Sequence, residues 1–304
     1  MAEAAFKAGY VAVIGRPNVG KSTLMNALLG QKVAAVSPRP QTTRRRQLGI
    51  LTLPQAQIIF VDTPGIHQPV DKLGNYMNDV ALATLQDADL LLWLVSADQP
   101  PSDEDRLIAS RLERLKSLPP VILTLNKTDL LTAKQLAQRK TQFQELLPGA
   151  KIKTISATAK LHLDELQTAI VAHLPKGQPF FDAEQVTDLY EREIAVELIR
   201  EAVLMTLRDE VPHSVAVRLD EYKDRGEDAA YIAATLFVER ESQKGIVIGR
   251  GGETLKQIGS QARKEIEALT ERKVFLELRV KVSKNWRNDA NALQTLGYAL
   301  HRED

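Results

Sequence analysis

Short apolar runs alternate with amphipathic stretches of ten or more residues from Tyr10 to Leu174. Runs of this length are typical of buried strands, and apolar positions that recur every three or four residues are typical of helices covering a sheet. The alternation predicts an α/β domain with a mostly parallel sheet. Strands are expected at Tyr10–Ile14, Gln47–Leu53, Gln57–Val61, Leu90–Ser96, Val121–Asn126 and Lys151–Ser156, and helices at Lys21–Leu29, Leu73–Gln86, Asp103–Leu115, Lys134–Leu147 and Leu163–His173. Pro54-Gln55 predicts a hairpin, and therefore one antiparallel edge strand.

The pattern changes after Pro175-Lys-Gly-Gln-Pro179, where helical periodicity lapses. We expect a first domain over residues 1–175, a linker over 176–186 and a second domain over 187–304. The second domain reads as α+β, with a Gly-rich turn before its second helix. Its expected elements are a helix at Glu184–Leu207, strands at Ser214–Tyr222 and Ala230–Glu239, a helix at Glu253–Leu269 and a strand at Val274–Val282.

Composition excludes some chemistry and localises charge. The 304 residues allow two cores, and the absence of Cys excludes disulfides and thiol nucleophiles and fits a reducing compartment. Neither a signal peptide nor a membrane span is recognisable, so a cytoplasmic protein is expected. The net charge of +1 conceals a basic region, because Arg240 to Arg287 holds twelve Lys and Arg against six Asp and Glu. A local basic face is consistent with nucleic-acid binding.

A phosphate-binding motif, GxxxxGK[ST], lies between the first predicted strand and helix. Its glycines allow backbone amides to converge on phosphate oxygens at a helix N-terminus. Lys21 would contact the β and γ phosphates, and Ser22 would ligate Mg²⁺. The expected nucleotide-binding residues here are Gly15, Arg16, Pro17, Asn18, Val19, Gly20, Lys21, Ser22 and Thr23.

A second motif, Asp62-Thr63-Pro64-Gly65, ends an apolar strand, so Asp62 should lie beside the phosphate loop and hold Mg²⁺ through water. The backbone N–H of Gly65 would approach the γ-phosphate and sense its presence. These motifs and the order of elements predict a P-loop domain that binds a nucleoside di- or triphosphate with Mg²⁺.

Guanine selection is assigned to Asn126-Lys127-Thr128-Asp129, at another strand end. The Asp129 carboxylate would accept two hydrogen bonds from N1–H and N2–H₂ of guanine, donors that adenine lacks. Asn126 would serve the purine edge, and the Lys127 stem would lie along the base. Ser156-Ala157-Thr158 follows the last strand and would offer a backbone N–H to guanine O6.

Val36 to Arg46 forms a long polar connection that is expected to order around the γ-phosphate and Mg²⁺. Either Thr42 or Thr43 should complete the Mg²⁺ shell, and the sequence leaves both open. The run Arg44–Arg46 is expected to be a solvated basic surface, with a catalytic or RNA-contacting role as the alternative. Residues placed in catalysis are Lys21, Thr42, Thr43 and Gly65.

Ile66 follows the Asp-x-x-Gly motif, where Ras-like enzymes carry the Gln that orients the attacking water. Hydrolysis of GTP should therefore be slow without help. Asn18 resembles the Asn that coordinates a monovalent cation in some GTPases, so a K⁺ requirement is an open possibility. His67 and Asp71 are assigned no catalytic role.

Gly249-Arg250-Gly251-Gly252 is a GxxG loop, with an apolar run before it and an amphipathic helix after it. This arrangement, inside the order helix, two strands, loop, helix, strand, resembles a type II KH domain. Such a loop clamps the backbone of about four nucleotides of single-stranded RNA. RNA-binding residues are expected at Ile248, Gly249, Arg250, Gly251, Gly252, Lys256, Arg279, Lys281, Lys284, Trp286 and Arg287. The alternative for Trp286 is a core anchor.

The Gln-Thr-Thr-Arg switch, the nucleotide motifs and the KH-like half together resemble the bacterial Era family. The resemblance implies a Ras-like G domain followed by a type II KH domain. It further implies a monomeric GTPase that binds small-subunit (16S) ribosomal RNA near its 3′ end and assists maturation of the 30S subunit, with peripheral contact to the cytoplasmic face of the membrane. An amphipathic tail at Ala290–Leu300 would pack on the KH core or reach a lipid surface.

Two alternatives remain open: a GTP-gated subunit of an RNA-modification complex, and a G domain that does not hydrolyse GTP. The absence of Cys and the intact Lys21, Ser22 and Asp62 argue against them. Under the favoured hypothesis, GTP orders two switch segments, Val36–Arg46 and the stretch after Gly65 that contains His67 and Asp71. The domains then rearrange about Pro175–Pro179, which alters RNA affinity.

Overall fold

A computed structural model describes residues 5–115, 117–226 and 228–298. The chain divides into two compact units. Unit 1 comprises Met1–Ala34, Thr43–Gln68 and Met77–Asp188, and unit 2 comprises Ala35–Thr42, Pro69–Tyr76 and Leu189–Asp304. No helix in the described ranges is long and apolar enough to cross a membrane.

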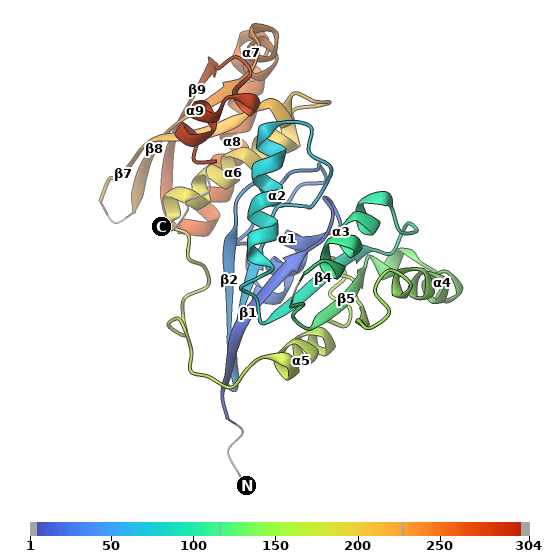
Figure 1. The fold of residues 1–304 in the computed structure, drawn as a ribbon. Coiled ribbons are helices and arrows are strands. Elements are labelled where there is room, and N and C mark those ends of the chain that lie inside the picture. Colours follow the sequence, from blue (N-terminus) through green and yellow to red (C-terminus); the bar gives the residue numbers. More distant parts are fainter. Residues whose placement is uncertain (1–4, 116, 227, 299–304) are drawn as a thin grey trace. The chain divides into compact units, whose positions relative to one another are not determined.

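Unit 1 is built on a six-stranded sheet in the order β2-β3-β1-β4-β5-β6 (Figure 1). β2 runs antiparallel to β3, and the remaining pairs are parallel. The predicted α/β class and the single antiparallel edge strand are confirmed. The strands are β1 (Lys7–Ile14), β2 (Gln47–Leu53), β3 (Ala56–Asp62), β4 (Leu90–Ser96), β5 (Val121–Asn126) and β6 (Lys151–Thr154).

Helices cover both faces of this sheet because its strands are apolar on both sides. They are α1 (Lys21–Leu29), α2 (Lys72–Thr84), α3 (Asp103–Glu113), α4 (Ala133–Gln144) and α5 (Leu163–His173). Leu24 of α1 and Ile170 of α5 pack on one face, and Ile108 of α3 and Phe143 of α4 pack on the other. The carboxyl ends of the parallel strands therefore meet at one open edge, where the predicted motifs begin.

The segment 175–188, expected to contain a linker, lies along unit 1 and is hydrogen-bonded to it. Pro175 O accepts the Ala8 N–H (3.1 Å), and Val186 O accepts the N–H of Ile50 on the edge strand β2 (2.9 Å). The Asp188 carboxylate accepts the Leu48 N–H (2.9 Å). We call residues 175–188 the strap. It covers part of the open edge of β2, whose backbone groups would otherwise face water.

Unit 2 carries a three-stranded sheet in the order β7-β8-β9, with β7 antiparallel and β9 parallel to β8. Its core joins α6 and α8 to the sheet through residues such as Ile199, Val203, Ile232 and Ile258. The predicted α+β class is confirmed. The elements are α6 (Glu191–Thr206), β7 (Ala216–Asp224), β8 (Ala229–Val238), α7 (Glu241–Ile248), α8 (Glu253–Thr270), β9 (Lys273–Val282) and α9 (Ala290–Thr295).

In this half one predicted helix began too early, and one helix was not predicted. The first helix begins at Glu191 rather than Glu184, because the Glu193 side chain accepts the Tyr190 N–H at the helix start. The apolar run before the GxxG loop forms a short helix, α7. It was not predicted because Gly245 lies inside it and glycine has a low helix propensity. In the tail, Leu293 and Leu296 are buried, which favours packing over lipid contact, and residues 299 and 300 lie outside the described part.

Candidate nucleotide and nucleic-acid sites

The phosphate loop joins β1 to α1, and its backbone requires two glycines. Gly15 has φ +152°, and a Cβ there would lie 2.3 Å from the Leu94 carbonyl oxygen. Gly20 has φ +99°, and a Cβ there would lie 2.5 Å from the Asn126 amide nitrogen. The loop therefore passes too close to β4 and β5 for any side chain at these positions. The predicted motif occupies the predicted place, between strand and helix.

Lys21 begins α1 and is 7% exposed. Its ammonium group donates to the carbonyl oxygens of Gly15 (3.2 Å) and Arg16 (3.1 Å). Burial lowers the pKa of Lys21 to about 8, and the Asp62 carboxylate opposes part of that shift. The cation is thus held among loop carbonyls, a place from which phosphate oxygens can attract it.

Three oxygen-bearing side chains converge beside Lys21. Ser22 Oγ donates to Asp62 Oδ2 (2.8 Å), Thr43 Oγ1 donates to the same oxygen (3.0 Å), and the two hydroxyls are 3.0 Å apart. Thr42, in contrast, donates its hydroxyl to the Arg39 carbonyl oxygen (2.8 Å). Of the two threonines that the sequence left open, the structure groups only Thr43 with Ser22 and Asp62.

The turn after β3 lies against the phosphate loop. A Cβ on Gly65 would be 2.7 Å from Pro17 N, and the Ile66 N–H donates to Gly15 O (3.2 Å). The Ile66 side chain is 1% exposed and packs in the core with α2 and α3. It therefore has neither the chemistry nor the position to orient a water molecule.

Side-chain contacts of His67, Asn78 and Arg16 hold this region. His67 Nδ1 lies 2.9 Å from Gly65 O, and the Asn78 amide donates to His67 O (2.8 Å). Arg16 Nε lies 3.3 Å from the fully buried Asp105 carboxylate at the start of α3. Arg44 is 1% exposed, so the expected solvated arginine run is wrong for its first member. No sequence motif identifies Asp105 as the partner of Arg16, because the two residues are 89 positions apart along the chain.

The residues assigned to the base lie at the ends of β5 and β6. Asn126 donates to Val19 O (2.8 Å) and accepts the Ala157 N–H (2.9 Å), so it ties the phosphate loop to the Ser156-Ala157-Thr158 turn. Its amide keeps one further N–H for a purine. The Lys127 ammonium is 3.9 Å from Asp98, and the Asp129 carboxylate is exposed and accepts no hydrogen bond from the described residues. Asp129 is therefore available to a ligand.

In unit 2 the GxxG loop connects α7 to α8 (Figure 1). Gly249 has φ +74°, and a Cβ there would lie 2.2 Å from Thr254 Oγ1. Gly251 and Gly252 also have positive φ, but a Cβ at either position would have no neighbouring atom within 4 Å. Gly249 is thus required by packing, whereas the bare backbone at Gly251 and Gly252 leaves room for a phosphate group.

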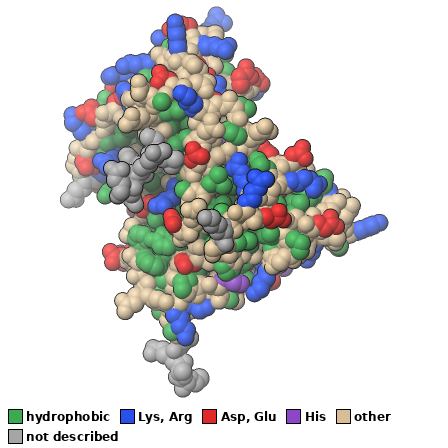
Figure 2. Space-filling model, viewed as in Figure 1, with side chains coloured by type: hydrophobic (Ala, Val, Ile, Leu, Met, Phe, Trp, Pro, Cys, Tyr) green, Lys and Arg blue, Asp and Glu red, His purple; other side chains and the backbone are tan. Residues whose placement is uncertain are grey.

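A groove of about 470 Å³ follows the loop between α8 and β9. Leu255, Leu276 and Leu278 form its apolar floor, and Lys256 and Arg263 stand at its side. Within the described residues, neither cationic side chain forms a hydrogen bond or an ion pair. An apolar floor beside unpaired cations suits bases and backbone phosphates respectively. Figure 2 shows Lys and Arg side chains, mixed with Asp and Glu, on the end of unit 2 that carries α7.

The other residues predicted to bind RNA differ in their exposure and in whether they form ion pairs. Arg250, Lys281 and Lys284 are exposed and Ile248 is half-buried, while Arg279 pairs with Glu277 (2.7 Å). Trp286 is fully buried and donates its indole N–H to Ser214 O (2.7 Å). Because Trp286 has no face open for a base, the predicted RNA-binding role is wrong and the alternative, a core anchor, is confirmed. Arg287 donates to the Glu239 carboxylate (2.7 Å) and is similarly engaged.

Comparison with known proteins agrees with both sites. Residues 10–127 match the 50S ribosome-binding GTPase family, and residues 210–287 match the KH domain family. GTPase Era of Geotalea uraniireducens is 46% identical over 298 residues, covering 98% of this chain and all of that protein. GTPase Era of Lacticaseibacillus paracasei is 48% identical, covering 95% of this chain and 96% of that protein.

Solved structures give the same result. A crystal structure of Era in complex with MgGDPNP and nucleotides 1506–1542 of 16S ribosomal RNA has a TM-score of 0.93 and 41% identity, covering 97% of this chain and all of that one. A crystal structure of a single-residue variant of Aquifex aeolicus Era bound to GDP·AlF₄⁻ has a TM-score of 0.92 and 41% identity over the same shares. The identity over nearly full length, together with the phosphate loop and the GxxG groove, establishes that this chain belongs to the Era family of GTPases.

Proposed function

We propose that this protein is a GTP-hydrolysing switch that binds the 3′ region of 16S ribosomal RNA through its KH groove and assists maturation of the 30S subunit. The observation that carries the proposal is the presence, in one chain, of a nucleotide site complete to its guanine-reading carboxylate and of a GxxG groove with unpaired cations. Its relative Era was crystallised with both MgGDPNP and nucleotides of this RNA.

The side chains beside the phosphate loop fit Mg²⁺. Two hydroxyls and a carboxylate within about 3 Å of one another are the hard oxygen donors that this cation prefers. Ser22 and Thr43 would hold the ion directly and Asp62 through water, with Thr42 outside the shell. When bound, Mg²⁺ supplies charge neutralisation at the phosphates. Lys21 would exchange its loop carbonyls for phosphate oxygens.

The rate of GTP hydrolysis by the protein alone depends on the residue after Gly65, which is Ile66. Because this side chain is in the core, no residue at that position orients water, and intrinsic hydrolysis is slow. The Gly65 N–H, held close to Pro17, would detect the γ-phosphate. We extend the proposal to a monovalent cation beside Asn18, which lies in the phosphate loop and resembles the Asn that coordinates such a cation in some GTPases. Comparing hydrolysis in KCl and NaCl at equal ionic strength tests this part.

The Asp129 carboxylate selects guanine. Asp129→Asn replaces an acceptor by an amide that cannot accept from both guanine donors, so GTP affinity should fall by at least about 100-fold. Xanthosine triphosphate carries an acceptor where guanine has its N2 amine, so its affinity for the variant should rise. Unchanged GTP binding by the variant would place base recognition elsewhere.

The strap changes where the proposed rearrangement occurs. Residues 175–179 are hydrogen-bonded to unit 1 by Pro175 and by the Gly177 N–H, which donates to Phe6 O (3.1 Å). We therefore place the pivot after Asp188, before α6 begins at Glu191, rather than at the proline-containing segment. The strap would then move with the G domain.

The experiment is RNA binding to the full chain with GTP analogue, GDP or no nucleotide. Gly251→Asp places a carboxylate in the GxxG loop, in open space and at a φ that Asp tolerates. Gly251→Asn is the matched neutral control. We expect GTP-dependent binding that the Asp variant loses and the Asn variant largely keeps. Equal binding in all nucleotide states would refute the switch, and survival of binding in Gly251→Asp would refute the KH site.

A cytoplasmic, monomeric protein completes the proposal. Peripheral contact with the membrane, implied by the family resemblance, is tested by cosedimentation of the full chain with liposomes that contain anionic lipid. Recovery of the protein in the supernatant at physiological salt would remove that part of the proposal.

A further inference from the structure

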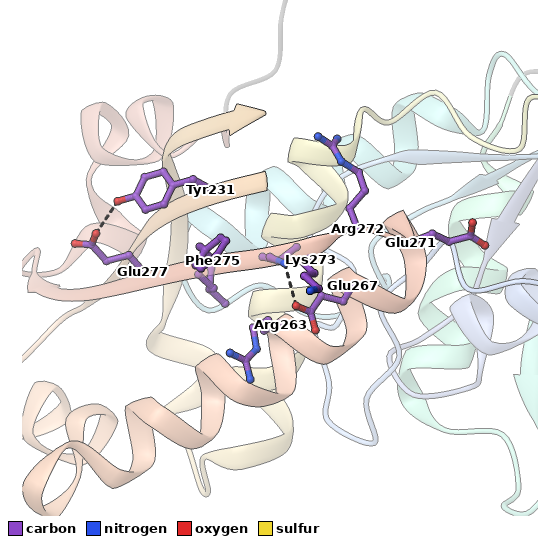
Figure 3. Close-up of a pocket in the computed structure, with 10 residues that line it drawn as sticks. Tyr231, Arg263, Glu267, Glu271, Arg272, Lys273, Phe275 and Glu277 are labelled. Carbon is purple, nitrogen blue, oxygen red and sulfur yellow. Dashed lines mark hydrogen bonds between the residues drawn. The ribbon is translucent and has the colours of Figure 1, made fainter. Parts of the chain in front are cut away.

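A second hollow, of about 770 Å³, lies at the far end of α8 from the GxxG loop. Its walls come from three elements: Tyr231 of β8, Arg263 and Glu267 of α8, and Lys273, Phe275 and Glu277 of β9 (Figure 3). None of these residues belongs to the GxxG loop.

This hollow continues the KH groove. Arg263 and Leu276 line both spaces. α8 begins at the GxxG loop and has 18 residues, which correspond to about 27 Å of helix. A nucleic-acid strand held at the loop and following α8 would therefore reach the second hollow next.

The hollow presents an aromatic face. Phe275 is 56% exposed, which is unusual for a large apolar side chain. The Arg225 guanidinium lies over the rings of Tyr231 and Phe275, 5.0 and 5.6 Å from their centroids. The Tyr231 hydroxyl donates to Glu277 (2.6 Å), which fixes the neighbouring ring. Arg225 thus covers part of one face of the Phe275 ring, and the exposed remainder of the ring is open for stacking.

The charges left over in the hollow are mainly positive. Glu277 is engaged by Tyr231 and Arg279, and Glu267 accepts the Val274 N–H (2.9 Å). Arg272 is engaged by Asp224 and Glu191. Two cations, Arg263 and Lys273, and one carboxylate, Glu271, have side chains without a hydrogen bond or ion pair among the described residues. A phosphodiester, which carries one negative charge, can pair with these two cations.

The backbone adds recognition groups. Among the strands that the structure describes, β9 is an edge strand of its sheet and pairs with β8 alone. Apart from the Val274 N–H, which donates to Glu267, backbone groups on the outer side of β9 can pair with the edges of bases that have left a helical stack.

We propose that this hollow is a nucleotide site, here called the extension site, formed by Arg263, Lys273, Phe275 and the outer edge of β9. It takes an RNA nucleotide adjoining the tetranucleotide in the KH groove, with the base on Phe275 and the backbone against the cations. The inference rests on the proposed RNA-binding function and adds a specific segment to it. A protein strand adding to the β9 edge is the competing occupant that the test must exclude.

The test measures binding of the full chain, with GTP analogue, to two single-stranded RNAs from the 16S 3′ end: a tetranucleotide that fills the KH groove and a strand of about twelve nucleotides. Phe275→Ala removes the stacking face and Lys273→Gln removes a cation. Lys264→Gln is the matched control, because Lys264 is exposed on α8 and lines neither hollow.

We expect Phe275→Ala to weaken binding of the longer RNA by roughly 5- to 150-fold, the range expected for loss of one stacked base. Lys273→Gln should weaken it less and reduce its salt dependence. Tetranucleotide binding and the melting temperature should not change, and Lys264→Gln should match the parent. When an abasic nucleotide replaces the stacked base, Phe275→Ala should have no further effect.

Several results would overturn the inference. Parent-like binding of the longer RNA by Phe275→Ala, with binding abolished in Gly251→Asp, would remove the extension site and leave the KH site standing. Parent-like binding by both variants would instead remove the proposed KH function. Equal losses for both RNAs, with a lower melting temperature, would make Phe275 structural. An oligoglutamate peptide that binds the parent but not Phe275→Ala, with no effect of this variant on RNA, would assign the site to a protein partner.

Discussion

The side-chain amide of Gln57 encloses the backbone of Phe181. Gln57 Oε1 accepts the Phe181 N–H (3.0 Å), and Gln57 Nε2 donates to the Phe181 carbonyl oxygen (2.8 Å). The same Oε1 accepts the Phe180 N–H (2.7 Å), and Gln57 is fully buried. One polar side chain on β3 thus satisfies three backbone groups of the strap.

Gln57→Leu should therefore be costly. It leaves these partly buried backbone groups without their protein partners and buries an apolar side chain against them, so the free energy of unfolding should fall by about 1 to 3 kcal/mol in urea titrations. Thr52→Val is the control, because it removes only the hydroxyl that accepts from Gln57 Nε2 (3.0 Å). It should cost about 1 kcal/mol. Equal stability of Gln57→Leu and the parent would contradict the role of this amide.

Thr43 and Thr42 should differ in their effect on Mg²⁺. Thr43→Val removes a hydroxyl grouped with Ser22 and Asp62, so the Mg²⁺ affinity of the GTP-bound protein should fall by roughly 10- to 100-fold. Thr42→Val removes only the bond to Arg39 O and should change it by less than about threefold. Mg²⁺ titration of nucleotide release measures both, and the reverse order of effects would move the ligand to Thr42.

The lowered pKa of Lys21 predicts a pH dependence of the nucleotide-free protein. Between about pH 8 and the ordinary value of 10.5, the folded state binds fewer protons than the unfolded state, so the free energy of unfolding rises with pH. Below pH 8 the cost of burying the ammonium is present in full. Lys21→Met removes the titrating group and should lack this rise.

Urea unfolding of the parent and of Lys21→Met at pH 7.5, 9 and 10 isolates the effect, since other groups titrate alike in both. The parent should gain roughly 1 to 3 kcal/mol relative to the variant across this range. A difference that stays constant with pH would mean that Lys21 keeps an ordinary pKa in the folded protein.

Trp286→Phe distinguishes a core role of Trp286 from a role in RNA binding. The variant leaves Ser214 O without its indole donor and opens space in the core, so it should lower the free energy of unfolding by about 1 to 3 kcal/mol. RNA affinity at a temperature where the variant is folded should stay within about twofold, because a fully buried ring contacts no base. A large affinity loss without destabilisation would restore the stacking role.

The phosphate loop was predictable because its constraints are local. Gly15 and Gly20 are needed for positive φ and for close approach of neighbouring strands, and these needs leave a fixed spacing in the sequence. The same holds for Gly249, which contacts Thr254 only five positions later. The mostly parallel sheet and its one antiparallel edge strand also followed from the apolar runs and the hairpin at Pro54-Gln55.

Long-range partners were not predictable. Gln57 meets Phe181 across 124 positions of sequence, and nothing in either local pattern marks the pair. Thr42 and Thr43 are identical in chemistry, so only the backbone could decide which hydroxyl reaches Asp62. Trp286 has the composition of an RNA-stacking residue and the location of a core residue, a distinction that depends on Ser214 in another part of unit 2.

The strap also determines where the chain can be cut. The turn-forming residues suggest a domain boundary at Pro175. A fragment that ended there would expose the Leu48 and Ile50 N–H groups. It would also leave the buried Gln57 amide without its hydrogen-bond partners on the strap. Such a fragment would carry an open, aggregation-prone edge. The shortest nucleotide-binding piece expected to remain soluble by itself extends to Asp188, and limited proteolysis of the full chain should release it by cleavage close to Tyr190, which is 67% exposed.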